Sequence, residues 1–124
     1  MKFRIARHTD NLKKIAAFYS GLPEMAVLGS FEGHDGYDGI FIGKPGESWH
    51  LEFTQSTEPA QHSPDDDDLL VFYYEEETPY REALRYLDTT TPRIPAKNPY
   101  WNVNGVCYKD PDGFGLVVVL IQNL

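Results

Sequence analysis

Polar side chains that could bind a ligand or transfer protons lie in two segments with strand character in the first half of the chain. Successive side chains of a strand point to opposite faces, so Arg4 shares one face with His8, and His50 shares one face with Glu52. An arginine beside a carboxylate can hold an anionic or polar molecule, and histidine, with an ordinary pKa of about 6.5, can transfer protons. We therefore expect Glu52, His50 and His8 as catalytic candidates and Arg4 as a ligand-binding candidate.

The elements that must position these residues occur twice along the chain. Apolar residues at helical spacing indicate an amphipathic helix in each half; they are Leu12, Ile15, Ala16 and Tyr19, then Tyr80, Ala83, Leu84 and Leu87. One expected strand precedes each helix and three follow it; the strands are residues 2–8, 24–31, 37–42 and 48–55, then 68–74, 92–97, 101–108 and 114–121. Each half therefore has the order βαβββ.

We expect a single domain over residues 1–124, because each half alone is small for a stable core. The first module spans about residues 1–55 and the second about 68–124, with a linker at about 56–67 that carries prolines and the start of an acidic run. Those acidic residues are interpreted as a solvated surface, since adjacent like charges repel and stay exposed.

Composition excludes several partner classes. The formal net charge of −8 opposes binding to the phosphate backbone of nucleic acid. No apolar stretch approaches the roughly 20 residues that span a bilayer, so no membrane partner is expected. A single cysteine, Cys107, cannot form an internal disulfide and is interpreted as a core residue. The first residues are too charged for a signal peptide, so we expect a cytoplasmic protein.

Several sequence blocks, taken in order, resemble a known superfamily. The paired modules, the run Ala17–Leu22 and the turn Asp110–Gly113 resemble the vicinal oxygen chelate superfamily, which includes glyoxalase I, fosfomycin- and bleomycin-resistance proteins and extradiol dioxygenases. Finer matches resemble its YycE-like branch; they are Arg4–Arg7, Leu28–Gly36, His50–Thr54 and Asn98–Trp101. The resemblance implies an α+β fold in which two βαβββ modules form incomplete barrels around a cavity, and it implies a homodimer.

The resemblance also implies where a metal would bind. Metal enzymes of the superfamily place four ligands on the concave face, and these positions fall on Arg4, Glu52, Leu69 and Val117. Only Glu52 can ligate a metal, because arginine stays charged and the last two are apolar. No metal or other cofactor is therefore expected, and Arg4 would approach Glu52 where the ion would have been. A divalent Zn, Ni, Mn or Fe ion held by unrecognised ligands is the minor alternative.

The second module offers a different surface under the same alternation of side chains. Its inward positions are apolar or aromatic and predict an apolar pocket; they are Leu69, Val71, Tyr73, Val117 and Val119. Tyr73 is a ligand-binding candidate, together with Tyr100 and Trp101, which we place on a loop or strand edge near the mouth of a site. The two aromatics could equally cover the core or a dimer interface.

Three functions fit these residues. The first is a metal-independent protein that binds or modifies a small molecule beside Arg4, His50 and Glu52. The second is a metal-dependent glyoxalase or thiol-transferase enzyme, and the third is a dimer that sequesters a drug without chemistry. A structural Arg4–Glu52 ion pair is the simpler explanation of that pair, and His34 and His62 are expected in solvent-facing loops.

Overall fold

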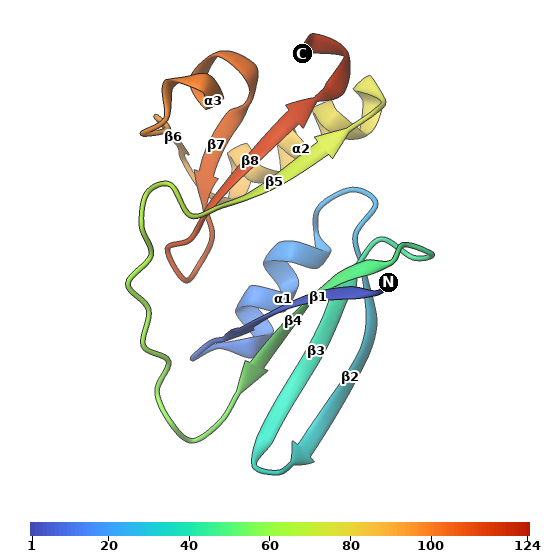
Figure 1. The fold of residues 1–124 in the computed structure, drawn as a ribbon, viewed down its shortest axis with the longest axis vertical. Coiled ribbons are helices and arrows are strands. Elements are labelled where there is room, and N and C mark those ends of the chain that lie inside the picture. Colours follow the sequence, from blue (N-terminus) through green and yellow to red (C-terminus); the bar gives the residue numbers. More distant parts are fainter. The chain divides into compact units, whose positions relative to one another are not determined.

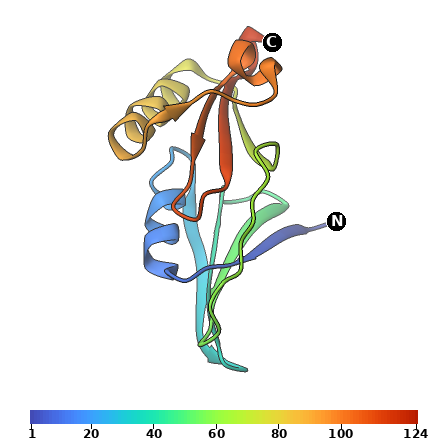
Figure 2. The ribbon, with the colours of Figure 1, turned by 90° about the vertical axis from the view of Figure 1, so that its left-hand side faces the viewer.

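The computed structural model describes all 124 residues and divides them into two compact units, Met1–His62 and Ser63–Leu124. Each unit has an open four-stranded sheet with a helix across one face (Figures 1 and 2). The fold is therefore α+β, as expected. No helix is long and apolar enough to cross a membrane.

The first unit contains five elements, which are β1 (Phe3–His8), α1 (Leu12–Ser20), β2 (Ala26–His34), β3 (Tyr37–Gly43) and β4 (Trp49–Gln55). The strand order is β1-β4-β3-β2, with β1 parallel to β4 and the other pairs antiparallel. The Asp35-Gly36 turn between β2 and β3 has positive φ at both residues, as in a two-residue β-hairpin turn.

Helix α1 begins where the side chain of Asn11 accepts a hydrogen bond from the Lys14 backbone N–H, a typical N-terminal cap. Its apolar stripe is buried, and the ring of Tyr19 stacks on Phe53 of β4 at 5.3 Å between centroids. Because Phe53 faces α1, the alternate residues His50 and Glu52 of β4 point to the opposite face of the sheet.

The second unit repeats this topology with one insertion. Its elements are β5 (Leu69–Tyr74), α2 (Glu77–Thr90), β6 (Arg93–Ile94), α3 (Pro99–Asn104), β7 (Val106–Lys109) and β8 (Gly115–Leu120), followed by a short 3-10 turn at Ile121–Asn123. The strand order β5-β8-β7-β6 matches that of the first unit, and β5 is parallel to β8. Ala83 and Leu87 of α2 are fully buried.

One predicted strand is wrong over half of its length. Residues 101–104, expected as the start of a strand, lie instead in α3, and only Val106–Lys109 pairs with the sheet. The side chain of Asn98 accepts from the Tyr100 backbone N–H, and Pro99 occupies the first turn. An asparagine cap followed by proline is a typical helix start, and it outweighs the strand propensity of the aromatic residues. The strand expected at 92–97 is shorter, between Pro92 and Pro95.

The segment that follows β4 returns along the first unit. The Nε2 atom of His62 lies 2.6 Å from the carbonyl oxygen of His8, and the Ala60 backbone N–H donates to the Asp10 carboxylate at 2.7 Å. His62 is therefore partly buried and hydrogen-bonded, which corrects the expectation that it faces solvent; His34 is exposed.

Candidate functional site

Arg4, His50 and Glu52 come together on the sheet face opposite α1. Arg4 and His50 are register partners on β1 and β4. The Nε–H of Arg4 donates to His50 Nε2 at 3.0 Å, and Arg4 Nη1 donates to Glu52 Oε2 at 3.4 Å. The Arg4 side chain is 49% exposed whereas that of Glu52 is 12% exposed. The guanidinium is therefore anchored at one side and open to solvent at the other, and the ion pair expected from the sequence is present.

Two aromatic rings form the surface beside this cluster. The Arg4 guanidinium carbon lies 4.9 Å from the centroid of the Phe41 ring, and Phe41 meets His50 edge to face at 5.5 Å. The Phe31 ring lies 5.8 Å from Phe41 and crosses Gly39, where a Cβ would overlap it. We call the surface formed by these residues the Arg4 face; it consists of Arg4, Phe31, Phe41, His50 and Glu52.

The sequence analysis missed Phe31 and Phe41, although a signal for Phe41 was present. Gly39 and Phe41 alternate with Ile40 and Ile42, and β3 pairs with β4 in a register that places Phe41 opposite Glu52. If β3 and β4 had been treated as a hairpin with strands of equal length, the alternation of side chains would have placed the Phe41 ring next to the Glu52 carboxylate.

Burial and the neighbouring arginine together determine the protonation of His50. Since the Arg4 Nε–H can only donate, His50 Nε2 must accept, and the proton of the neutral imidazole is on Nδ1. Burial lowers the pKa of His50 below 6.5, and the positive charges of Arg4 and Lys2 lower it further, against an upward effect of Glu52. His50 is therefore neutral near pH 7, and its lone pair is committed to orienting the guanidinium rather than to accepting a proton from a ligand.

His8 takes no part in this cluster. Its partner in the register is Thr54, two positions along β4 from Glu52, which corresponds to roughly 7 Å along a strand. Its Nε2 atom lies 3.1 Å from Ser56 Oγ, and its ring meets Tyr37 at 6.2 Å. The structure thus brings three of the four predicted residues of this unit together and places His8 in a separate contact with the segment that follows β4.

The donor set of the Arg4 face does not fit a divalent cation. No group of three or more His, Cys, Asp or Glu side chains comes together there. His50 Nε2 and Glu52 Oε2 both already accept from Arg4, and the permanent positive charge beside them would repel a metal ion.

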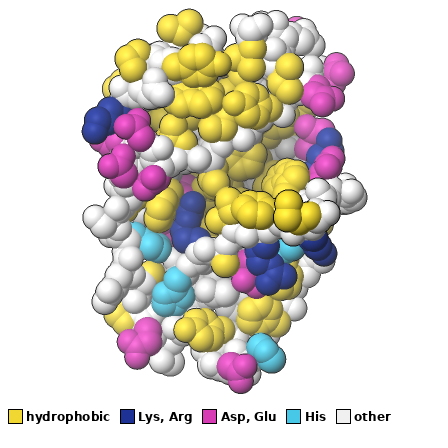
Figure 3. All heavy atoms as spheres, in the orientation of Figure 1, with side chains coloured by type: hydrophobic (Ala, Val, Ile, Leu, Met, Phe, Trp, Pro, Cys, Tyr) yellow, Lys and Arg dark blue, Asp and Glu magenta, His cyan; other side chains and the backbone are white.

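Part of the corresponding face of the second unit is covered. Val117 and Val119 are fully buried and Cys107 is 5% exposed, and Trp101 of α3 packs against the cluster that they form. This part of the expected apolar pocket is therefore the interior of a core, closed by a helix that the sequence analysis did not predict. Figure 3 shows that apolar side chains dominate the visible surface of the second unit, whereas histidine and charged side chains lie among apolar ones on the first.

The three aromatic candidates of the second unit differ in exposure. Trp101 packs on the core, whereas Tyr73 and Tyr100 are 49% and 50% exposed. The Tyr100 and Trp101 rings meet edge to face at 4.9 Å. A ligand-binding role for Tyr73 and Tyr100 stays a prediction, and the position of Trp101 gives it a structural role in addition.

Comparison with known proteins identifies the family. The YycE-like N-terminal domain matches residues 3–54, and the YycE-like C-terminal domain matches residues 67–121. The chain belongs to the YycE-like family. The uncharacterised protein YycE of Bacillus subtilis is 38% identical over 120 residues, which cover 94% of this chain and 85% of that protein. The YycE-like resemblance found in the sequence is therefore confirmed.

Solved structures agree with this YycE-like assignment. The crystal structure of a YycE protein of unknown function from Bacillus subtilis has a TM-score of 0.84 at 36% identity, covering 95% of this chain and 88% of that one. The trypanothione-dependent glyoxalase I of Leishmania major has a TM-score of 0.72 at 16% identity, covering 96% and 85%. TnmS3, an antibiotic binding protein from Streptomyces sp. CB03234, has a TM-score of 0.67 at 16% identity, covering 97% and 94%. The last two show the fold alone.

Proposed function

We propose that this YycE-like protein binds a small organic anion with an aromatic or other apolar body on the Arg4 face, without a metal ion. The observation that carries the proposal is the half-exposed guanidinium of Arg4, held in place by His50 and Glu52. Its bonds to His50 and Glu52 use Nε and one hydrogen of Nη1, which leaves the hydrogens of Nη2 and the second hydrogen of Nη1 as donors for a ligand. That remaining edge matches the two oxygens of a carboxylate or phosphonate.

The aromatic rings beside the guanidinium supply the apolar part of the proposed site. Phe41 lies under Arg4, and Phe31 continues the same surface away from the charge. A ligand whose anionic group meets Arg4 can therefore lay its body on these rings, and apolar surface with a few polar groups that fix orientation is the usual composition of ligand sites. The Glu52 carboxylate, by neutralising part of the Arg4 charge, favours singly charged ligands.

Sequestration without chemistry is the second candidate, and one observation favours it over catalysis. The lone pair of His50 Nε2 already accepts from Arg4, and His8 is engaged with Ser56. Glu52 is then the remaining candidate on this face for proton transfer, and it is itself paired with Arg4. A binding protein needs the guanidinium and the rings but no free base.

The test uses three ligands of one shape and different charge. Benzoate, benzyl alcohol and benzylamine are titrated into the full-length protein and followed by backbone amide NMR shifts. We expect benzoate to bind with shifts at residues of β1, β3 and β4 and the other two to bind at least tenfold more weakly. Arg4→Met should weaken benzoate binding at least tenfold, since a charged hydrogen-bonded pair contributes about 1.5–3 kcal/mol.

Arg7→Met is the matched control for Arg4→Met. Arg7 lies on the same strand with its guanidinium 5.5 Å from the Phe53 ring, on the other face of the sheet. Its replacement makes the net charge more negative by the same one unit but should leave benzoate affinity unchanged. Equal losses in both variants, or tighter binding of benzylamine, would contradict the proposal. Stoichiometric Zn²⁺, Ni²⁺ or Mn²⁺ binding that Glu52→Gln abolishes would instead favour a metal-dependent enzyme.

A further inference from the structure

A cavity lies within the second unit, and all the residues that line it belong to that unit. Its volume is about 460 Å³, within the roughly 300–1,000 Å³ typical of small-molecule sites. It opens between the start of β5, the loop that joins β6 to α3, and β7. We call it the β5–β7 pocket; its lining includes Asp65, Asp66, Leu69, Ile94, Lys97 and Lys109.

The floor of the β5–β7 pocket is apolar. Leu69, Ile94 and Ala96 pack against the buried cluster that contains Cys107. Gly115 lets Leu69 lie flat across the start of β8, because a Cβ there would overlap the leucine side chain. The floor is therefore the part of the apolar sheet face that α3 leaves uncovered, and it rests on a packed core.

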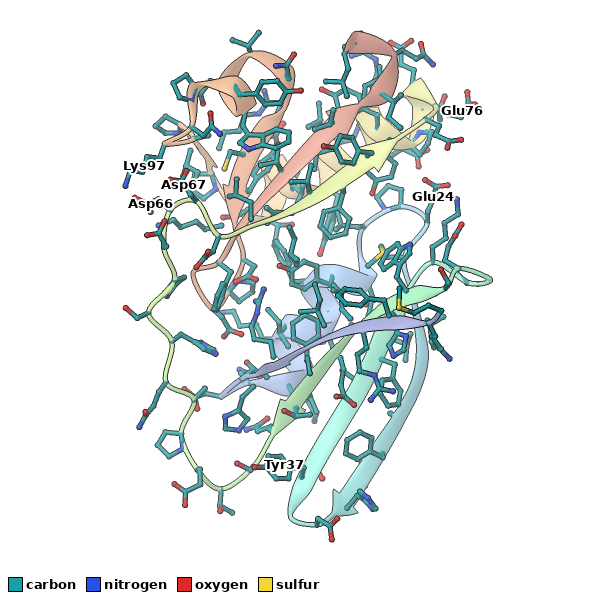
Figure 4. All side chains as sticks on the ribbon, in the orientation of Figure 1. Glu24, Tyr37, Asp66, Asp67, Glu76 and Lys97 are labelled. Atoms are coloured by element: carbon teal, nitrogen blue, oxygen red, sulfur yellow. The ribbon has the colours of Figure 1, made fainter.

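The rim of the pocket carries charges of both signs. Asp65 and Asp66 come from the loop before β5, and Lys97 and Lys109 come from the β6–α3 loop and β7. Figure 4 shows Lys97 near Asp66 at this edge of the unit. Lys109 Nζ lies 3.7 Å from Asp66 Oδ1, with the two side chains 49% and 61% exposed. That contact is long for an ion pair, and exposed pairs contribute little, so a ligand can replace it.

The loop that carries the carboxylates is held in one conformation. The Asp67 backbone N–H donates to Asp65 Oδ1 at 2.8 Å, and the Asp68 backbone N–H donates to the Asp65 carbonyl at 3.0 Å. The Asp65 backbone N–H in turn donates to Asp68 Oδ2 at 3.3 Å. These hydrogen bonds order the turn that places Asp66 at the pocket rim, so no ligand is needed to order it.

From these contacts we propose that the β5–β7 pocket binds a small zwitterion with an apolar side chain, such as a free branched α-amino acid. Its ammonium group meets Asp66, its carboxylate meets Lys97, and its side chain covers Leu69 and Ile94. Two positive and two negative groups line the rim, so a ligand with one charge alone gains one partner and meets a repelling charge opposite. The proposal uses no residue of the Arg4 face.

Three ligands of one shape separate the two charged contacts. L-leucine, 4-methylpentanoate and 3-methylbutylamine share the same branched chain and carry both charges, the carboxylate alone and the ammonium alone. Titrations of full-length protein, followed by amide NMR shifts, should show L-leucine binding at residues that line the pocket. Each single-charge analogue should bind at least tenfold more weakly. Equal binding of an analogue, or no shifts at the pocket with L-leucine, would overturn the proposal.

Charge-removing variants test the same contacts from the protein side. Lys97→Met and Asp66→Asn should each weaken L-leucine binding about tenfold or more, as expected for one charged hydrogen bond. The matched controls Lys44→Met and Asp35→Asn remove the same charges from exposed positions in the first unit and should leave L-leucine affinity unchanged. An unchanged affinity for L-leucine in Lys97→Met or Asp66→Asn would also overturn the proposal. Both variants should bind benzoate as the wild type does, which distinguishes this result from a change at the Arg4 face.

Discussion

The two units share one topology and use the same sheet face in opposite ways. In the first unit the face opposite the helix carries Arg4, His50 and Glu52 beside aromatic rings. In the second, Trp101 of α3 packs over part of the equivalent surface, and Val117 beneath it is fully buried. In both units the first and last strands of the unit pair in parallel, and the other strand pairs are antiparallel. The βαβββ scaffold therefore determines where a site can form, and single residues on it decide whether one does.

The largest expected effect comes from exchanging the residues at equivalent strand positions. Glu52 of β4 is the register partner of Ala6, and Val117 of β8 is the register partner of Val71. Val117→Glu should lower the free energy of unfolding by about 3 kcal/mol or more, because an unpaired carboxylate would be buried beneath Trp101. Urea denaturation of the variant measures this loss.

The reciprocal change provides the control. Glu52→Val removes the carboxylate beside an arginine that stays half exposed, so it should cost about 1 kcal/mol or less. NMR signals of the two indole groups report the units separately, because Trp49 lies in the first and Trp101 in the second. Similar losses for both substitutions would contradict the distinction between an open and a covered face.

The next effect concerns the helix that covers the second unit. Trp101→Ala should lower the free energy of unfolding by about 2–3 kcal/mol, below the usual range for a buried tryptophan because the indole is partly exposed. Tyr100→Ala, one position earlier on α3 and 50% exposed, should cost less than about 1 kcal/mol. Urea denaturation of both variants checks the difference, and equal losses would show that α3 does not close the core through Trp101.

Periodicity predicted most of the fold because each element has a local cause. The apolar stripes of α1 and α2 and the alternation in β4 are read directly from residue spacing. The covering helix was missed because its short segment contains aromatic residues typical of strands, and its only strong signal is the pair Asn98-Pro99. The Arg4–Glu52 pair could be anticipated through the superfamily resemblance, whereas the rings of Phe31 and Phe41 depend on a register that spacing along one strand does not contain.

The β5–β7 pocket shows a second reason why the site could not be predicted in full. Its rim joins Asp66, Lys97 and Lys109, which are far apart in the sequence and lie in loops or at a strand end. The acidic run at 65–68 was interpreted as a solvated surface, and Asp66 is indeed exposed. Only the folded loops show that lysines from two other segments border the same apolar floor.

The smallest effect tests the link between Arg4 and the protonation of His50. Burial is the largest cause that lowers the pKa of His50 below 6.5, and the charge of Arg4 is the second. The unfolded chain therefore takes up a proton on this residue at a higher pH than the folded chain does. The contribution of His50 to the free energy of unfolding is fully present above about pH 6.5. It falls as the pH decreases from about 6.5 to the folded pKa and is constant below that pKa. In His50→Gln this part of the pH dependence should be absent.

An NMR titration of the His50 ring separates the two causes. In Arg4→Met its pKa should rise, because a nearby positive charge is lost, but should stay below 6.5, because the effect of burial exceeds the opposing effect of Glu52. Arg7→Met, whose guanidinium lies against Phe53, should leave the titration unchanged. A wild-type pKa above about 7 would mean that the imidazole is mostly charged beside Arg4 at neutral pH. The hydrogen bond that orients the guanidinium would then be lost at that pH, and the Arg4 face of the first unit would no longer be prepared for a ligand.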